Sequence, residues 1–244
     1  MREIVLDTET TGFEPETGDR IVEIGAVELN NHIPTGRTYH QYINPERNMP
    51  EDAFGVHGIG PDLLDTPRAA KPGEVILRDK PVFAKIGQQF VDFVAGARLV
   101  IHNASFDMKF LNAELRWMGL PALPMDQAID TLMIARKKFP GSPASLDALC
   151  RRFAIDNTSR TLHGALLDSE ILAEVYLELI GGRQPGLVLS AGSGLGRGES
   201  GSDDWRPAPR PKKLAPRITD REARAHQAFV ETLGPDALWA KLNQ

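Results

Sequence analysis

Cysteine is almost absent from this sequence, since Cys150 is the only one among 244 residues. An internal disulfide is therefore excluded. We expect Cys150 to be a small core residue, because it ends an apolar run and nothing around it supports a nucleophilic role. Long hydrophobic runs are also missing, and no stretch approaches the roughly 18 apolar residues that cross a membrane. The N-terminus begins directly as a predicted strand, so we expect no signal peptide and a cytoplasmic protein without a membrane partner.

Basic charge is scarce over most of the chain. Residues 1–181 hold 18 Lys and Arg against 26 Asp and Glu, a net charge of −8, whereas residues 182–244 carry a net charge of +3. An acidic domain without a continuous basic surface should bind DNA weakly and dissociate from it quickly. If such a protein acts on DNA, it would benefit from a partner that holds the DNA. With 41% apolar residues, the length allows one substantial core and an appendage.

Two acidic residues lie where a helix should carry an apolar side chain. Residues 104–118 predict a helix, and the same-face neighbours of Asp107 three, four and eight positions later are Phe, Leu and Leu. Residues 165–180 predict another, and the same-face neighbours of Asp168 are Ile, Leu and Val. An unpaired carboxylate on an apolar face is costly, so each is expected to be paired or bound to metal.

A second pair of acids, Asp7 and Glu9, follows an apolar strand at the N-terminus. Side chains two apart on a strand point to one face, roughly 6.6–6.8 Å apart. Alone, such a pair is usually a solvated strand end, and a lone buried Asp is more often salt-bridged. Together, four carboxylates favour a hard cation such as Mg²⁺ or Mn²⁺. Two such ions, roughly 3.5–4 Å apart, can stabilise the attacking and leaving oxygens of a phosphodiester hydrolysis.

One histidine can join these acids only from a loop. His163 precedes Asp168 by five residues, and on one helix the two side chains would point about 140° apart. Residues 160–164 predict a loop that enters the helix, which removes this obstacle. An imidazole with a pKa near 6.5 could then take a proton from an attacking water. By itself, a lone His is more often structural or exposed.

The remaining pattern predicts an α/β fold with a mixed sheet flanked by helices. The opening strands, separated by tight loops, indicate an antiparallel meander, and the later alternation of elements indicates α/β crossovers. A long loop rich in Pro and Gly is expected over residues 44–80. The predicted strands are near 2–7, 21–30, 37–43 and 98–101, and the predicted helices are near 81–94, 104–118, 131–138, 145–154 and 165–180.

Three blocks resemble the motifs of the DEDD exonucleases of the histidine type, specifically those of the epsilon proofreading subunits of bacterial DNA polymerase III. They are residues 5–12 (VLDTETTG), 100–107 (VIHNASFD) and 161–168 (TLHGALLD). The resemblance is dense over about residues 1–180, and it implies a ribonuclease H-like exonuclease fold with a flexible C-terminal tail. Three further blocks match the epsilon pattern: residues 21–28 (IVEIGAVE), 54–59 (FGVHGI) and 145–150 (SLDALC).

The resemblance also implies roles for single residues. Asp7 would contact both divalent ions, Mg²⁺ or Mn²⁺, while Glu9, Asp107 and Asp168 complete their shells, and His163 would be the general base that generates the attacking hydroxide. The reaction implied is 3′→5′ hydrolysis that releases nucleoside 5′-monophosphates, with mispaired ends preferred because they unstack more easily. The residues implied to hold the terminal nucleotide are Asp7, Glu9, Thr10, Thr11, Gly12, Val56, His57, Asn103 and Asp168. His57 could instead only cap a turn.

The composition changes after Gly182, so residues 1–181 are expected to be the exonuclease domain. Residues 182–218 are rich in Gly, Pro and Ser and predict a flexible linker. Within it, residues 184–189 (QPGLVL) resemble the peptide that bacterial proteins use to bind the sliding clamp. The clamp contacts implied are Gln184, Leu187 and Leu189.

Residues 219–244 open with a capping box, Thr219 to Glu222, and predict a helical docking segment. The resemblance names the polymerase alpha subunit as its partner, at a bacterial replisome on the nucleoid, and leaves open a further small stabilising subunit. The alternative is that this helix folds back on the nuclease domain. Residues 65–80 depart from the epsilon pattern like an insertion, for which we expect a surface loop rather than a lining of the DNA path.

The resulting hypothesis is a proofreading exonuclease acting on DNA 3′ ends. Within the enzyme class, the alternatives are a free-standing repair exonuclease and an RNA-trimming relative. The tail argues against both, because a small trimming nuclease needs neither a clamp peptide nor a docking helix. Outside the enzyme class, the alternative is a non-catalytic interaction subunit on a nuclease fold. All five signature residues are present, which argues against that alternative.

Overall fold

A five-stranded mixed sheet forms the centre of the nuclease part of the chain. The computed structural model describes residues 1–158, 162–182 and 218–234, and the chain divides into two units, Met1–Val188 and Leu189–Gln244. The order β3-β2-β1-β4-β5 combines an antiparallel meander, β1 to β3, with parallel pairing of β4 to β1 and of β5 to β4. The strands are β1 (Arg2–Thr10), β2 (Ile21–Asn30), β3 (Ile33–Tyr42), β4 (Arg98–Ile101) and β5 (Ala128–Asp130).

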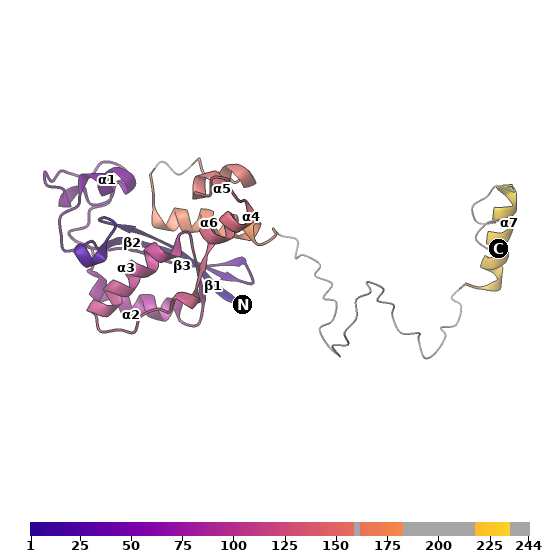
Figure 1. Cartoon of the computed structure of the whole chain (residues 1–244), viewed down its shortest axis with the longest axis horizontal. Helices are drawn as coiled ribbons and strands as arrows, with labels where there is room; N and C mark the ends of the chain where they lie inside the picture. The colour runs from indigo at the N-terminus through magenta and orange to yellow at the C-terminus, as the bar shows by residue number, and fades with distance from the viewer. Residues whose placement is uncertain (159–161, 183–217, 235–244) are drawn as a thin grey trace. The chain divides into compact units, whose positions relative to one another are not determined.

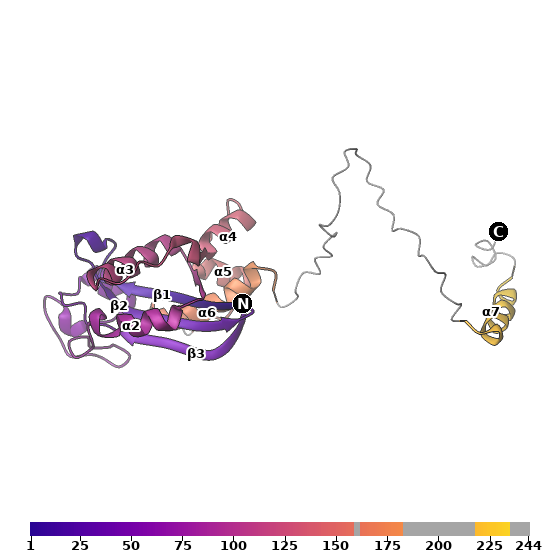
Figure 2. The ribbon, with the colours of Figure 1, turned by 90° about the horizontal axis from the view of Figure 1, so that it is seen from below.

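Helices cover both faces of this sheet. Helices α2 and α3 lie on one side of it, and α6 lies on the other against β1 and β2 (Figure 1). Seen from below, α2 crosses in front of the strands (Figure 2). Helices α4 and α5 pack against α6. The helices of this unit are α1 (Glu51–His57), α2 (Phe83–Val94), α3 (Ala104–Trp117), α4 (Thr131–Lys138), α5 (Leu146–Phe153) and α6 (Ala165–Leu179).

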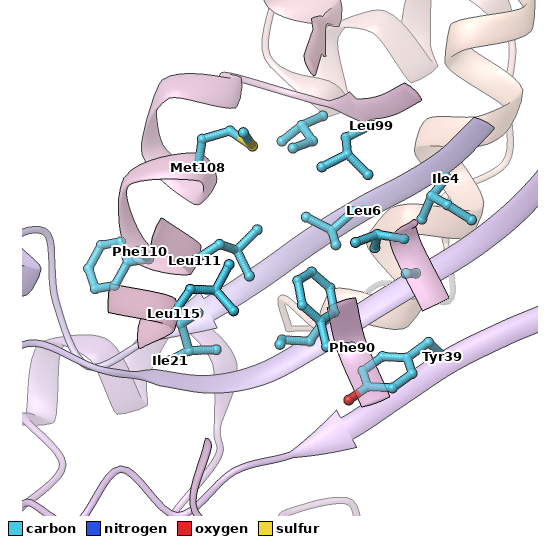
Figure 3. Close-up of a cluster of buried hydrophobic side chains, with 14 of the residues drawn as sticks. Ile4, Leu6, Ile21, Tyr39, Phe90, Leu99, Met108, Phe110, Leu111 and Leu115 are labelled. Carbon is cyan, nitrogen blue, oxygen red and sulfur yellow. The ribbon is translucent and has the colours of Figure 1, made fainter. Parts of the chain in front are cut away.

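Strand alternation divides the core into two layers. Ile4 and Leu6 on β1 point into a cluster with side chains of α2 and α3, several of which Figure 3 labels, including Phe90 and Leu111. Val5 points the other way, into a cluster with side chains of α6. Because side chains alternate along a strand, Asp7 and Glu9 share the face of Val5 and therefore lie on the α6 side.

The second unit contributes one described helix, α7 (Asp220–Thr232). Thr219 caps it, with its hydroxyl accepting from the Glu222 backbone N–H and the Glu222 carboxylate accepting from the Thr219 N–H. This confirms the predicted capping box. Its apolar residues Phe229 and Leu233 are exposed. The predicted clamp peptide 184–189 lies outside the described residues. Among the residues the structure does describe, no helix has the length and apolar character needed to cross a bilayer.

Most predicted elements are confirmed, but the stretch expected to be one long loop, residues 44–80, is wrong in part. It contains the short helix α1 and a 3-10 turn at Pro61–Leu63. Strand β3 begins at Ile33 rather than near residue 37, and the three-residue β5 was not predicted. Cys150 is fully buried, as expected of a core residue.

Residues 65–80 are anchored more firmly than a simple surface loop. Leu77 is fully buried in a cluster with Val22 and Ile59. The Asp62 carboxylate accepts hydrogen bonds from the backbone N–H groups of Leu77 and Arg78, at 3.0 and 2.9 Å. The expected surface loop is therefore anchored in its C-terminal part, where Leu77 packs against the segment that follows α1.

Candidate active site

The first two carboxylates come from β1, near its C-terminal end. Asp7 pairs in register with Gly25 of β2, and Glu9 pairs with Glu23. Opposite Asp7 the sheet therefore presents a glycine, and the first turn of α6 packs directly on it: a Cβ built on Gly25 would lie 2.1 Å from the backbone nitrogen of Leu166. This close approach brings the start of α6 against β2, directly beside the strand that carries both acids.

Two helix starts supply the other carboxylates. Asp107 lies in the first turn of α3 and Asp168 in the first turn of α6, and each is only 3% exposed. The Thr8 hydroxyl, on the α3 side of β1, donates to Oδ1 of Asp107 at 2.7 Å. Both acids therefore lie on the buried side of their helices, as their apolar same-face neighbours predicted.

The four carboxylates and His163 line one cavity of about 1050 Å³. Glu9, His163 and Asp168 each offer a ligand atom, and these atoms all lie within 4.8 Å of one another. The structure thus brings together all five residues predicted to carry the chemistry, from three segments far apart in the sequence.

Burial, with electrostatic repulsion added to it, disfavours the charged form of two carboxylates in this cavity. Burial raises the pKa of Asp7 well above its ordinary value, and the negative charges of Asp107, Glu9 and Asp168 raise it further. Burial raises the pKa of Asp107 to about 7, against the lowering effect of the Thr8 hydrogen bond. A divalent cation would relieve this repulsion, and four carboxylates form an all-oxygen donor set suited to a hard ion. The residues present therefore fit a divalent metal.

His163 stands in the loop before α6, as its spacing from Asp168 required. Helix α6 begins at Ala165, with Gly164 as its N-cap. The backbone N–H of His163 donates to the Val56 carbonyl at 3.2 Å, which ties this loop to α1. Its side chain is 49% exposed, with Nδ1 3.7 Å from Oδ2 of Asp168. Residues 160 and 161 of the predicted loop lie outside the described part of the chain.

Five of the residues predicted to touch only the terminal nucleotide also line the cavity: Thr10, Thr11, Gly12, Val56 and His57. Asn103 is not among the described residues that line it. Instead Asn103 precedes α3 with a left-handed φ of 69°, and its backbone N–H donates to Asp130 at 3.3 Å.

His57 is buried and held by backbone groups on both ring nitrogens. Nδ1 accepts from the Ile59 N–H at 3.0 Å, which leaves Nε2 as the donor toward the Thr10 carbonyl at 3.3 Å. Burial lowers its pKa to about 4, so the ring is neutral at physiological pH. The turn-capping role considered for His57 is thus present, together with a tie from α1 to the end of β1.

Several lining residues were not singled out from the sequence. Phe13 is 82% exposed at the cavity, and its ring meets Phe106 edge to face with centroids 6.4 Å apart. Phe13 directly follows the first motif, and that position was the available signal. Arg136 and Asp147 line the cavity from α4 and α5, and nothing in their local sequence distinguishes them from ordinary exposed helix residues.

Comparison with known proteins agrees with this geometry. The family model described as Exonuclease matches residues 4–176. DNA polymerase III subunit epsilon of Rickettsia felis is 52% identical over 187 residues, covering 75% of this chain and 76% of that protein. DNA polymerase III subunit epsilon of Escherichia coli is 41% identical over 249 residues, covering 98% and 97%. Among solved structures, the nuclease domain of 3′hExo, a DEDDh family member bound to rAMP, superposes with a TM-score of 0.57 at 22% identity, covering 73% of this chain and 91% of that one, which supports the fold.

Proposed function

Because this chain belongs to the exonuclease family, and within it to the group of bacterial DNA polymerase III epsilon subunits, we propose that it removes mispaired nucleotides from DNA 3′ ends. The observation that carries this proposal is the convergence of Asp7, Glu9, Asp107, Asp168 and His163 on one cavity. The products would be nucleoside 5′-monophosphates.

The family depends on divalent metal, and we assign the ligands to the four carboxylates of the cavity. Two ions, Mg²⁺ or Mn²⁺, would be held by oxygens of Asp7, Glu9, Asp107 and Asp168. When bound, such ions polarise the scissile phosphate and stabilise the attacking and leaving oxygens. The protein contributes the fixed placement of these oxygens on the end of one strand and the starts of two helices.

His163 takes the proton of the attacking water in this proposal. Its imidazole is half exposed, so it can exchange protons with solvent between turnovers, and Asp168 beside Nδ1 stabilises the protonated ring. The bond from its backbone N–H to Val56 restrains the loop that carries it. A general base must come within reach of the proton that it takes, and His163 lines the same cavity as the four carboxylates.

The terminal nucleotide would rest against the turn that follows β1. Thr10, Thr11 and Gly12 supply backbone at the cavity wall, and Val56 supplies an exposed apolar side chain. The exposed ring of Phe13 offers a face on which a base can stack. A frayed single strand can enter such a cavity more readily than a paired end, which favours mispaired termini.

The tail would connect this nuclease to the replication machinery. The relative from E. coli is related over 98% of this chain and is named as a polymerase subunit. We propose that residues 219–244, which begin with α7 and its exposed Phe229 and Leu233, dock on the polymerase alpha subunit. Residues 184–189 would bind the sliding clamp, with residues 182–218 as the linker. The proposed place of action is therefore the replisome on the bacterial nucleoid.

The test compares nucleotide release from 3′-labelled DNA with paired and mispaired ends, in Mg²⁺ or Mn²⁺, for the wild type and His163→Ala. We expect faster release from mispaired ends and its loss in the variant. An RNA strand of the same sequence serves as the competing substrate. No release of nucleotides from DNA with either metal, by protein shown to be folded, would overturn the proposal, and release from RNA alone would point to a trimming role.

A further inference from the structure

Helix α6 begins without a cap from its own sequence. Its N-cap is Gly164, which has no side chain to accept from the first backbone N–H groups of the helix. Yet this first turn must be held firmly, because Asp168 lies in it and His163 directly precedes it. The missing acceptor comes from far away in the sequence: Oε2 of Glu23 accepts from the Ala165 N–H at 3.0 Å.

Glu23 is itself locked in place on β2. It is 2% exposed, and Oε1 lies 2.7 Å from Nε2 of His40 on the neighbouring strand β3. The Tyr42 hydroxyl is hydrogen-bonded to the same carboxylate, and burial together with the Glu23 charge raises the pKa of Tyr42 to about 12. A carboxylate at a helix N-terminus is also favoured by the helix dipole.

A second contact with α6 lies two residues further along β2. Gly25 leaves the space in which the backbone of α6 approaches the strand, and the Ser169 hydroxyl donates to the Gly25 carbonyl at 2.9 Å. The start of α6 is therefore fastened to β2 at two points, by Glu23 at Ala165 and by Ser169 at Gly25.

A buried negative charge at the position of Glu23 costs free energy, which calls for a role that requires an acceptor there. Glu23 stands opposite Glu9 in the strand register, and its charge adds to those that raise the pKa of Asp7. A purely space-filling residue here would serve better without a negative charge, because the cavity already holds four carboxylates. The hydrogen bond to the α6 backbone accounts for an acceptor at this position.

We infer that Glu23 is a positioning residue that ties the first turn of α6 to β2 and so fixes the carboxylate and the imidazole of that segment against the acids of β1. Its essential property is the reach of its acceptor oxygen rather than its charge. This inference rests on the proposed nuclease function for its kinetic consequence, but the tie itself exists without substrate or metal.

Two substitutions of Glu23 test separately the position of its acceptor oxygen and its negative charge. Glu23→Gln keeps an oxygen at the same distance from the Ala165 N–H and removes the charge. Glu23→Asp keeps the charge but is one methylene too short. Glu3→Asp is the matched control. Glu3 lies on β1, is as buried as Glu23 on the same face of the sheet, and accepts from the Tyr176 hydroxyl of α6 at 2.8 Å, far from the first turn.

The first readout is hydrogen exchange of the backbone amides of residues 165–168 in metal-free full-length protein. The second is kcat and KM for release of nucleotides from single-stranded DNA. We expect Glu23→Asp to speed this exchange at least tenfold and to lower kcat by about 10–100-fold with little change in KM, because a displacement near 1 Å can cost about that much. Glu23→Gln should stay within about threefold of wild type in both, and Glu3→Asp should leave kcat and exchange at 165–168 unchanged.

The reverse pattern would overturn the inference. If Glu23→Asp behaves like wild type while Glu23→Gln loses activity, the charge is what matters. If Glu23→Asp and Glu3→Asp lower kcat equally, Glu23 is merely part of the core. If the wild type releases no nucleotide, the proposed function fails by itself, and the exchange experiment still decides whether Glu23 holds the α6 start.

Discussion

Gly25→Ala should damage activity more than its size suggests. An alanine Cβ at this position would lie 2.1 Å from the Leu166 nitrogen, 2.2 Å from the Ala165 carbonyl carbon and 2.4 Å from its oxygen. All three atoms belong to the backbone, so no side-chain rotamer change relieves the contact. The φ of Gly25 lies outside the left-handed range, so an alanine fits the strand itself and the effect isolates the lack of space.

The distances at Gly25 determine how far α6 must move in the Gly25→Ala variant. Real Cβ atoms essentially never approach other heavy atoms closer than 3.0 Å, so the first turn of α6 must retreat by roughly 1 Å. Overpacking of this kind typically costs about 1–3 kcal/mol of stability. The same displacement moves Asp168 and His163 away from the acids of β1, which should lower kcat by about 100-fold.

The assay pairs urea unfolding followed by circular dichroism with release of nucleotides from single-stranded DNA at saturating Mg²⁺. Gly55→Ala in α1 is the control for stability, because its Cβ would meet no atom within 4 Å. If Gly25→Ala keeps kcat within about threefold of wild type and unfolds like Gly55→Ala, the close packing of α6 on β2 does not position the site.

Three further outcomes are expected. Asp7→Ala should abolish release of nucleotides in Mg²⁺, and unchanged release would contradict the assignment of Asp7 as a metal ligand. The substitution should not lower the thermal unfolding midpoint of the metal-free protein, because it removes one of several mutually repelling buried carboxylates. Burial lowers the pKa of His57 to about 4, whereas a histidine in the unfolded chain has a pKa of about 6.5. As the pH falls below 6.5, the unfolded chain therefore takes up a proton at this position before the folded chain does. The free energy of unfolding should fall by on the order of 3 kcal/mol between pH 6.5 and 4. Urea titrations of wild type and His57→Gln measure this, and equal pH slopes would refute it. Deletion of residues 190–244 should leave cleavage of free single strands intact and abolish co-elution with the polymerase subunit; retained co-elution would exclude the tail as the docking segment.

Periodicity predicted the strands, the helices and the burial of two acids. Asp107 and Asp168 stood out because an acid on an apolar helix face violates a local rule, and that violation is visible within a dozen residues. His163 could be placed in a loop by the same means, since helical geometry excluded the alternative. The resemblance then added roles that periodicity cannot supply.

What the sequence did not reveal depends on contacts between distant residues. Glu23 sits in an alternating strand, where an acid is ordinarily solvent-facing, and its partner Ala165 N–H is 142 residues away. Helix α1 has seven residues and β5 has three, too few for a periodic pattern to emerge. Leu77 lay in a segment rich in Pro and Gly, and only its packing against Val22 shows that this segment is anchored.

The distance along the chain between the halves of the site has a consequence for synthesis on the ribosome. Asp7 and Glu9 are translated at the very start of the domain, whereas His163 and Asp168 emerge with α6, the final described helix of the nuclease unit. A nascent or prematurely terminated chain that ends before residue 163 carries Asp7, Glu9 and Asp107 but neither His163 nor Asp168, and it lacks helix α6, which packs on β1 and β2. With the roles proposed for His163 and Asp168, such a fragment would not cut DNA, and the nuclease would become active only once its domain has been made in full.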